Sequence, residues 1–157
     1  MLAHRIGADT VQLQGKKAVP PGAVAAVSAA VRERGWHLVK SLALAEGNIE
    51  ELTALALAYS PHIDALLLDT TWGGGSGRRN DPTRARAIRD AVDVPVIVAG
   101  GLTPENVAAV VREVRPFGVD VESGVEATFT NVAGCSTRAC SPHRVEAFVR
   151  AVAEGDS

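Results

Sequence analysis

The sequence predicts an α/β fold built around a parallel β-sheet. Short apolar runs recur along the chain, stretches long enough for amphipathic helices separate them, and the runs are continuously apolar rather than alternating. Continuous apolar character indicates that both faces of a strand are covered, as helical crossovers cover them in a parallel sheet. With 157 residues, 46% hydrophobic and 22% charged, residues 1–157 are expected to form one domain.

Five of these runs are predicted to be strands. They are Thr10–Gln14, His37–Leu44, Ala65–Asp69, Val94–Gly100 and Gly118–Ser123. Their alternation with helical stretches is typical of a doubly wound sheet or of part of a (β/α)8 barrel. Because a barrel typically has about 250 residues and eight such units, length alone favours the open sheet.

Helix start signals fall between the predicted strands. Asn48 is followed three residues later by Glu51, which is the spacing of a capping box, and Thr103 precedes Pro104 at the expected first helical position. Two more helices are predicted, one starting at Asp81-Pro82 and running to residue 92, and one over Pro142–Ala153.

Composition and charge narrow the class of partner. The net charge of −2 is spread over interspersed acids and bases, so neither nucleic acid nor an anionic membrane surface is an expected partner. The first residues lack a secretory signal pattern, and no apolar stretch is long enough to span a bilayer, so we expect a cytoplasmic protein that binds a small molecule. Cys135 and Cys140 have neither the partners of a zinc site nor redox spacing, so no metal is predicted and both are expected to be reduced thiols without a chemical role.

Asp69 is the candidate catalytic acid because of its place at a strand end. In parallel α/β folds, reactive groups gather at the carboxyl ends of the strands. Asp69 follows the apolar run 65–68, whereas Asp64 precedes it and falls at the opposite edge. Two readings of Asp69 remain open: a carboxylate hydrogen-bonded by loop amides, or a partly dehydrated carboxyl that donates a proton.

The next two strand ends predict a phosphate site. Gly100 and Gly101 directly follow one strand, and Ser123 and Gly124 follow the next. Backbone N–H groups exposed by glycine, together with a hydroxyl, form an anion pocket, and loops after the last two strands of a barrel commonly bind phosphate.

Together these motifs resemble phosphoribosylanthranilate isomerase of tryptophan biosynthesis. The similar segments are "VQLQG", "ALLLDT" followed by "GGGSG", "VPVIVAGGLTPENV", "GVDVESGVE" and the terminal "RVEAFV". The resemblance covers nearly the whole chain and overrides the length argument. It implies a partial (β/α)8 TIM barrel of the ribulose-phosphate-binding type, with strands four to eight present and the N-terminal units missing.

The resemblance also implies a reaction, an Amadori rearrangement without cofactor or metal. Asp69 would protonate the ribose ring oxygen and open the furanose to a Schiff base, after which a general base removes the C2 proton. The resulting enolamine tautomerises to the 1-deoxyribulose phosphate. The other implied site residues contact the phosphosugar substrate: Gly100, Gly101, Ser123 and Gly124 at the phosphate, and Asp120 and Gln14 elsewhere in the site.

Several family features are absent from the printed sequence. The family's general base, a cysteine in a Cys-Gly-x-Thr motif after strand one, and its carboxylate-binding arginine after strand two have no counterpart, and Cys135 and Cys140 match neither. Gln14 stands where the family has histidine, and Glu122 where it has serine. The loop "GGGSGRRNDP" loses an aromatic pair and gains two arginines, which, like Arg138 in a lengthened later loop, are expected to be solvated.

Two explanations of the short N-terminus stay open. In the first, translation starts upstream of Met1. In the second, the polypeptide is truncated in life, and a partner such as a second copy in a homo-oligomer covers its exposed strand edges. The chain alone is expected to be inactive, since activity would require a base such as His37 or Glu122. The alternatives to the isomerase are a non-catalytic sugar-phosphate-binding module and a divergent phosphosugar barrel enzyme.

Overall fold

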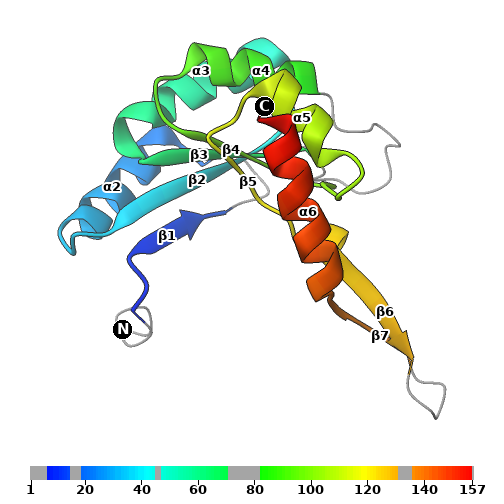
Figure 1. Cartoon of the computed structure of the whole chain (residues 1–157). Coiled ribbons are helices and arrows are strands. Elements are labelled where there is room, and N and C mark those ends of the chain that lie inside the picture. The colour runs from blue at the N-terminus through cyan, green and yellow to red at the C-terminus, as the bar shows by residue number, and fades with distance from the viewer. Residues whose placement is uncertain (1–6, 15–18, 45–46, 71–81, 131–135, 157) are drawn as a thin grey trace.

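The computed structural model describes residues 7–14, 19–44, 47–70, 82–130 and 136–156. Five of its strands form one sheet in the order β1-β2-β3-β4-β5, with every neighbouring pair parallel (Figure 1). These strands are β1 (Thr10–Leu13), β2 (His37–Ala43), β3 (Ala65–Asp69), β4 (Val96–Ala99) and β5 (Gly118–Val119). The described α-helices are α2 (Pro21–Arg32), α3 (Ile49–Tyr59), α4 (Pro82–Ala91), α5 (Val107–Val114) and α6 (Pro142–Gly155).

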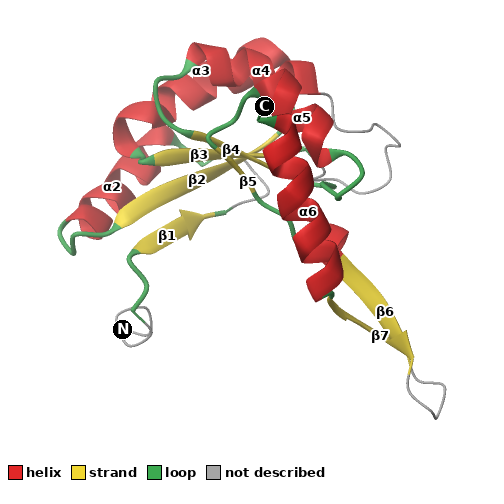
Figure 2. Cartoon of the chain, viewed as in Figure 1, coloured by secondary structure: helices red, strands yellow, loops and turns green. Residues whose placement is uncertain are grey.

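The helices α2 to α5 lie on one side of the sheet, and α6 packs against α5 (Figure 2). The core fills the space between them, where Leu38, Leu66 and Val98 from three adjacent strands are buried together with Val107 of α5. A doubly wound sheet would carry helices on both faces. Sequential strand order with helices on one face is instead the arrangement found in units of a (β/α)8 barrel. The predicted parallel α/β fold is therefore confirmed, and the open doubly wound sheet that length alone favours is wrong.

Two helix starts test the capping predictions. The Asn48 side chain accepts a hydrogen bond from the Glu51 N–H at 2.8 Å, and α3 begins at the next residue, as predicted. The helix expected after Thr103 begins later, with Asn106 before its first residue. The reason is that the Asn106 side chain accepts from the Thr103 N–H at 2.8 Å and donates to the Gly101 carbonyl at 2.9 Å, which holds residues 103–106 in a turn.

The strand bounds agree best where burial is complete. The strand predicted at Ala65–Asp69 has those bounds in the structure. The run predicted as Gly118–Ser123 is a strand only over Gly118–Val119, because the chain then turns into the short 3-10 helix η2 (Ser123–Val125). A second 3-10 helix, η1 (Ser60–His62), follows α3.

The long loop expected after the last strand contains an antiparallel hairpin. Its strands are β6 (Glu126–Thr130) and β7 (Ser136–Cys140), which project away from the sheet and helices (Figure 1). Cys140 is an exposed free thiol, and Cys135 lies outside the described residues.

A charged side chain is buried in the core. Lys40 of β2 is only 2% exposed; its Nζ donates to the Ser41 carbonyl and lies 5.4 Å from the centre of the Tyr59 ring. The Tyr59 hydroxyl in turn donates to the Val19 carbonyl at 2.6 Å. Burial lowers the pKa of Lys40, since the surrounding core disfavours its charged form.

Within the described part of the chain, no helix combines the length and the apolar character needed to cross a membrane.

Candidate functional site

A pocket of about 150 Å³ lies at the carboxyl ends of the central strands, and we call it the strand-end pocket. All the predicted site residues are among those that line it. Its lining comprises Gln12, Gln14, Leu67, Asp69, Ala99, Gly100, Gly101, Leu102, Asp120, Val121, Glu122, Ser123 and Gly124. The structure therefore brings together side chains and loops from four strands that are far apart in the sequence, while their individual roles stay predictions.

Asp69 is the last residue of β3 and lies at the centre of the sheet. Asp69 pairs in register with Ala43 on one side and Ala99 on the other, and it is half-buried. Its backbone carbonyl accepts a hydrogen bond from the Leu44 N–H at 2.8 Å. The strand ladders on both sides therefore fix the backbone from which the carboxyl group extends.

Thr70, which the sequence prediction did not include, supports the strand-end pocket without lining it. Its Oγ1 lies within hydrogen-bonding distance of two carbonyl oxygens, that of Ala99 at 3.0 Å and that of Gly100 at 2.9 Å. Thr70 thus ties the loop after β4 to the residue that follows Asp69. The signal was present, since a threonine directly after a strand-end acid can bond to the neighbouring strand end.

The loop after β4 turns on two consecutive glycines. Gly100 has φ 92° and Gly101 has φ 62°, in the left-handed region that side chains with a Cβ rarely adopt. The Asn106 side chain holds this loop from behind, as described above. The loop therefore presents glycine backbone to the strand-end pocket without side chains in the way.

The loop after β5 makes backbone contact with the loop after β4. A Cβ placed on Gly124 would lie 1.7 Å from the Leu102 carbonyl oxygen and 3.2 Å from the Thr103 Cα. Only glycine fits this approach, because any side chain would force the two loops apart. The two predicted phosphate loops are thus in contact with each other, just as the strands that they follow are neighbours in the sheet.

Two arginines bind carbonyl groups of the second loop. Arg138 of β7 donates to the Ser123 carbonyl at 3.3 Å and forms an ion pair with Glu126 at 3.1 Å. Arg144 of α6 donates to the Gly124 carbonyl at 3.0 Å. Arg138, expected to be a solvated loop charge, is exposed as predicted, but it lies on a strand and has these two partners.

The strand β1 and the residue that follows it contribute two glutamines to the pocket. Gln12 donates from Nε2 to the Ser41 Oγ at 3.1 Å, and Gln14 lies two residues further on, directly after the strand. The sequence reading singled out Gln14 and missed Gln12. Alternation along a strand places residues two apart on the same face, so the pattern could have identified both.

Other residues named from the sequence are not at this pocket. His37 is the first residue of β2, at the amino edge of the sheet, where its Nδ1 lies 3.9 Å from Asp64. Asp64 accepts a hydrogen bond from the Leu38 N–H at 2.7 Å, so it joins strands at that edge, as expected. Residues 71–81, which include the glycine-rich loop and its two arginines, lie outside the described residues.

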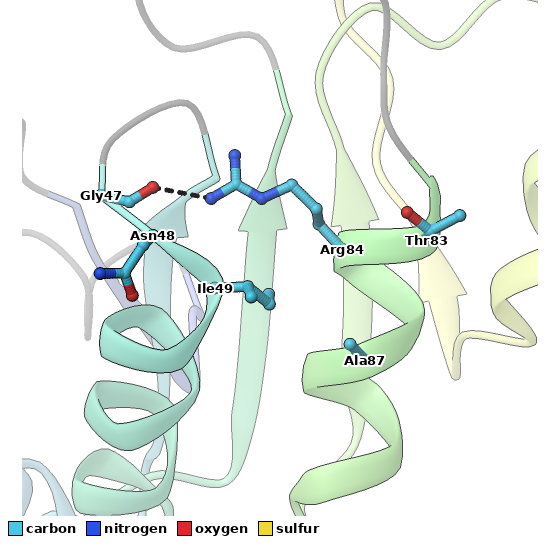
Figure 3. Close-up of a pocket in the computed structure, with 6 residues that line it drawn as sticks. All are labelled: Gly47, Asn48, Ile49, Thr83, Arg84 and Ala87. Atoms are coloured by element: carbon cyan, nitrogen blue, oxygen red, sulfur yellow. Dashed lines mark hydrogen bonds between the residues drawn. The ribbon is translucent and has the colours of Figure 1, made fainter.

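A second pocket, of about 470 Å³, opens between the first turns of α3 and α4. Figure 3 shows Arg84 reaching from α4 to the Gly47 carbonyl, to which it donates at 2.8 Å. Asn48 and Ile49 line the α3 side, with Thr83 and Ala87 among the residues on the α4 side. None of the predicted site residues lines this pocket.

Among the residues that the structure describes, no three or more His, Cys, Asp and Glu side chains are grouped so that they could hold a metal ion.

Comparison with known proteins identifies the family. The family model for N-(5'-phosphoribosyl)anthranilate (PRA) isomerase matches residues 1–129. The chain belongs to the PRA isomerase family. The PRA isomerase of Haloferax volcanii is 41% identical over 132 residues, covering 81% of this chain and 53% of that protein.

Solved structures of PRA isomerases resemble the chain as well. The enzyme from Thermococcus kodakaraensis aligns with a TM-score of 0.67 and 32% identity, over 96% of this chain and 66% of that one. A PRA isomerase in complex with reduced 1-(o-carboxyphenylamino)-1-deoxyribulose 5-phosphate aligns with a TM-score of 0.68 and 28% identity, over 97% of this chain and 63% of that one. The chain spans about half the length of the curated relative, at 53%.

Proposed function

We propose that this chain supplies the general acid and the phosphate-binding loops of a PRA isomerase of tryptophan biosynthesis. The observation that carries the proposal is that Asp69 and both glycine loops line one pocket at the carboxyl ends of the strands. Membership of the PRA isomerase family supports the choice of substrate, N-(5'-phosphoribosyl)anthranilate.

The phosphate is proposed to bind at the two loops. Backbone N–H groups of the Gly100–Gly101 and Ser123–Gly124 segments, with the Ser123 hydroxyl, offer hydrogen-bond donors to an anion without side chains blocking the approach. A related PRA isomerase structure holds a deoxyribulose 5-phosphate compound, which agrees with a phosphate site in this family.

Asp69 is proposed to donate the proton that opens the sugar ring. Its carboxyl group protonates the ribose ring oxygen, and the amino nitrogen of the anthranilate forms the Schiff base as the C1–O bond breaks. A general base then removes the C2 proton, and the enolamine tautomerises to the ketose product. Asp120 and Gln14, which line the same pocket, are proposed to bind substrate polar groups beside the reacting carbons.

The five strands are proposed to correspond to strands four to eight of the barrel. Two surfaces agree with further β/α units at both ends of the array. On one side, β1 pairs with β2 alone, so among the described strands its other edge has no neighbour. On the other side, α6 exposes Val145 and Val149, with Val149 62% exposed.

The 157 residues by themselves are proposed to be inactive. The printed sequence has no Cys-Gly-x-Thr motif, and Cys140 lies on the β6–β7 hairpin rather than in the strand-end pocket. His37 is at the wrong edge of the sheet to act as the base. Glu122 does line the pocket, so turnover by the purified chain would identify it as the first residue to test.

The test uses a fusion of this chain to the first three β/α units of the Haloferax volcanii relative. We expect PRA turnover by the fusion, and a loss of about 10²- to 10⁴-fold on Asp69→Asn, with affinity for ribose 5-phosphate retained. Asp64→Asn is the matched control at the opposite sheet edge, and turnover close to the parent fusion is expected. Unchanged turnover on Asp69→Asn would rule out the assigned acid.

A second candidate is a non-catalytic sugar-phosphate-binding module. It is favoured by the combination of two phosphate loops with no family base in the printed sequence. The DNA upstream of Met1 separates the two: an in-frame Cys-Gly-x-Thr segment supports the isomerase, and a nearby stop codon supports the module. A fusion that binds ribose 5-phosphate without any turnover would also favour the module.

A further inference from the structure

Arg144, near the start of α6, connects the two loops of the strand-end pocket. Its Nε donates to the Gly124 carbonyl at 3.0 Å, in the loop after β5. Its Nη2 lies 3.3 Å from each carboxylate oxygen of Glu105, in the turn after β4. One planar guanidinium group therefore binds both loops at once, and Arg144 is not among the residues that line the pocket.

The contact with Gly124 constrains backbone rather than a mobile side chain. The peptide unit is planar and trans, so its N–H points opposite to its C=O. Arg144 fixes the Gly124 carbonyl and Arg138 binds the preceding carbonyl, that of Ser123. The Gly124 N–H shares its peptide unit with the Ser123 carbonyl, so Arg138 directs this N–H away from itself, while Arg144 holds the following peptide unit through the Gly124 carbonyl.

The contact with Glu105 fixes the position of the other loop. Hydrogen bonding with Thr103 and with its own backbone, together with the nearby Arg144 guanidinium, lowers the pKa of Glu105, so its carboxyl group is ionised near neutral pH. The backbone of the two loops is already in close contact at Gly124 and Leu102. A link that holds both loops therefore sets how their backbone donors lie relative to one another.

Arg144 differs in this respect from an ordinary surface ion pair. Its side chain is 34% exposed, against 67% for Arg150, which lies further along α6 and pairs only with Glu146 at 3.1 Å in the same helix. An exposed pair within one helix contributes little to structure. Arg144 instead joins three segments, α6 and the two loops.

We propose that Arg144 is a positioning residue that holds the two loops in the arrangement that binds phosphate, without touching the phosphate itself. The proposal rests on the proposed phosphate-binding function of these loops. It predicts that loss of Arg144 weakens affinity for the phosphate group through the backbone of Gly124.

The experiment titrates the 157-residue chain with inorganic phosphate and with ribose 5-phosphate, following the backbone amide signals of Gly101 and Gly124 by NMR. The variants are Arg144→Met, Arg144→Lys and Glu105→Gln, and Arg150→Met is the matched control on the same helix. We expect Arg144→Met to weaken phosphate binding about tenfold or more, because it removes the donors to both loops. Arg144→Lys should restore part of the affinity, and Arg150→Met should leave it unchanged.

Glu105→Gln keeps the shape of the acceptor, removes one end of the link and leaves the Gly124 contact in place. It should weaken binding less than Arg144→Met and add nothing in the double variant, since both changes break the same link. It also tests the proposal if Arg144→Met fails to fold.

The outcomes separate this proposal from the function on which it rests. No phosphate binding by the unsubstituted chain would overturn the phosphate site and this proposal with it. Binding by the unsubstituted chain with equal affinity in the folded Arg144→Met and Arg150→Met variants would overturn the role of Arg144 alone. A structural role only would lower the thermal midpoint and leave the affinity of the folded protein unchanged.

Discussion

Gly124 shows how a single hydrogen in place of a side chain lets two loops form one site. The contact between this residue and the Leu102 carbonyl leaves no room for a methyl group. A larger residue must displace backbone on one side or the other, since neither neighbour is the end of a flexible side chain. The position therefore couples local stability to the shape of the pocket.

Gly124→Ala is expected to destabilise the protein by about 2 kcal/mol, the usual cost of inserting a methyl group into a well-packed region, and to weaken phosphate binding. Urea unfolding measures the first effect and phosphate titration the second. Gly22→Ala is the control, because a Cβ at that position in the first turn of α2 meets nothing within 4 Å. Gly22→Ala should be neutral or slightly stabilising. Equal stability of the two variants would contradict the close approach.

Lys40 offers a test of pH dependence at the residue scale. Burial lowers its pKa below the ordinary value of 10.5, so the folded state loses the proton at lower pH than the unfolded state. Between those two values the unfolded chain binds more protons, and the free energy of unfolding rises with pH. At neutral pH the buried charge therefore destabilises the fold, although the Tyr59 ring at 5.4 Å offsets part of the cost.

Lys40→Met is expected to be more stable than the parent at pH 7 by about 1 kcal/mol, because the buried charge is replaced by an apolar chain of similar length. The advantage should shrink as the pH rises towards 10.5 and level off above it, where the lysine is neutral in both states. Chemical unfolding at a series of pH values measures it, with the exposed Arg112→Met of α5 as control. An advantage that is constant with pH would contradict the role assigned to the Lys40 charge.

At the scale of elements, what could be predicted depended on whether local or distant groups fix the structure. The start of α3 follows from Asn48 and Glu51, three residues apart, so the sequence pattern suffices. The start of α5 depends on the bond from Asn106 to Gly101, which exists only once the preceding strand ends and the loop turns back. A Thr-Pro pattern could not reveal that competing turn.

The β6–β7 hairpin illustrates a different limit. Its residues are largely exposed, so no alternation of buried and exposed side chains marked the strands. The pairing of Glu126 with Cys140 brings the ends of the insertion together, and Val125 before it is buried. The hairpin therefore starts and ends at neighbouring positions beside the core.

The candidate site was largely predictable for a topological reason. The carboxyl ends of parallel strands meet at one edge, so polar residues and glycines that follow strands in the sequence must gather there. Asp69 and the two glycine loops were found by this rule. Arg138 and Arg144 escaped it because they act through backbone carbonyls, and nothing in a single sequence shows which carbonyl a long polar side chain will reach.

For the whole molecule, length and order of elements point in different directions. A count of strands favoured an open sheet, whereas the sequential order β1 to β5 with helices on one face agrees with barrel geometry. The number of residues in the chain does not determine the curvature of the sheet. That curvature depends on how each helix packs against the two strands that it connects. The family motifs were therefore the better guide to architecture.

Two apolar side chains of α6, Val145 and Val149, are exposed four residues apart and so share one face of the helix. Val145 and Val149 are 36% and 62% exposed, while Phe148 is buried against the core. If further β/α units complete the barrel, these two valines become buried, and each should contribute apolar contact area.

Val145→Gln combined with Val149→Gln should therefore weaken, by about tenfold, the binding of a separate polypeptide that carries the first three units of the Haloferax volcanii relative. Isothermal titration calorimetry measures the affinity, and thermal unfolding of the lone chain should be nearly unchanged. Leu57→Gln on α3, 48% exposed in the middle of the helix array, is the control and should bind like the parent. Equal affinity for the double variant and the parent would mean that the completing units do not cover α6.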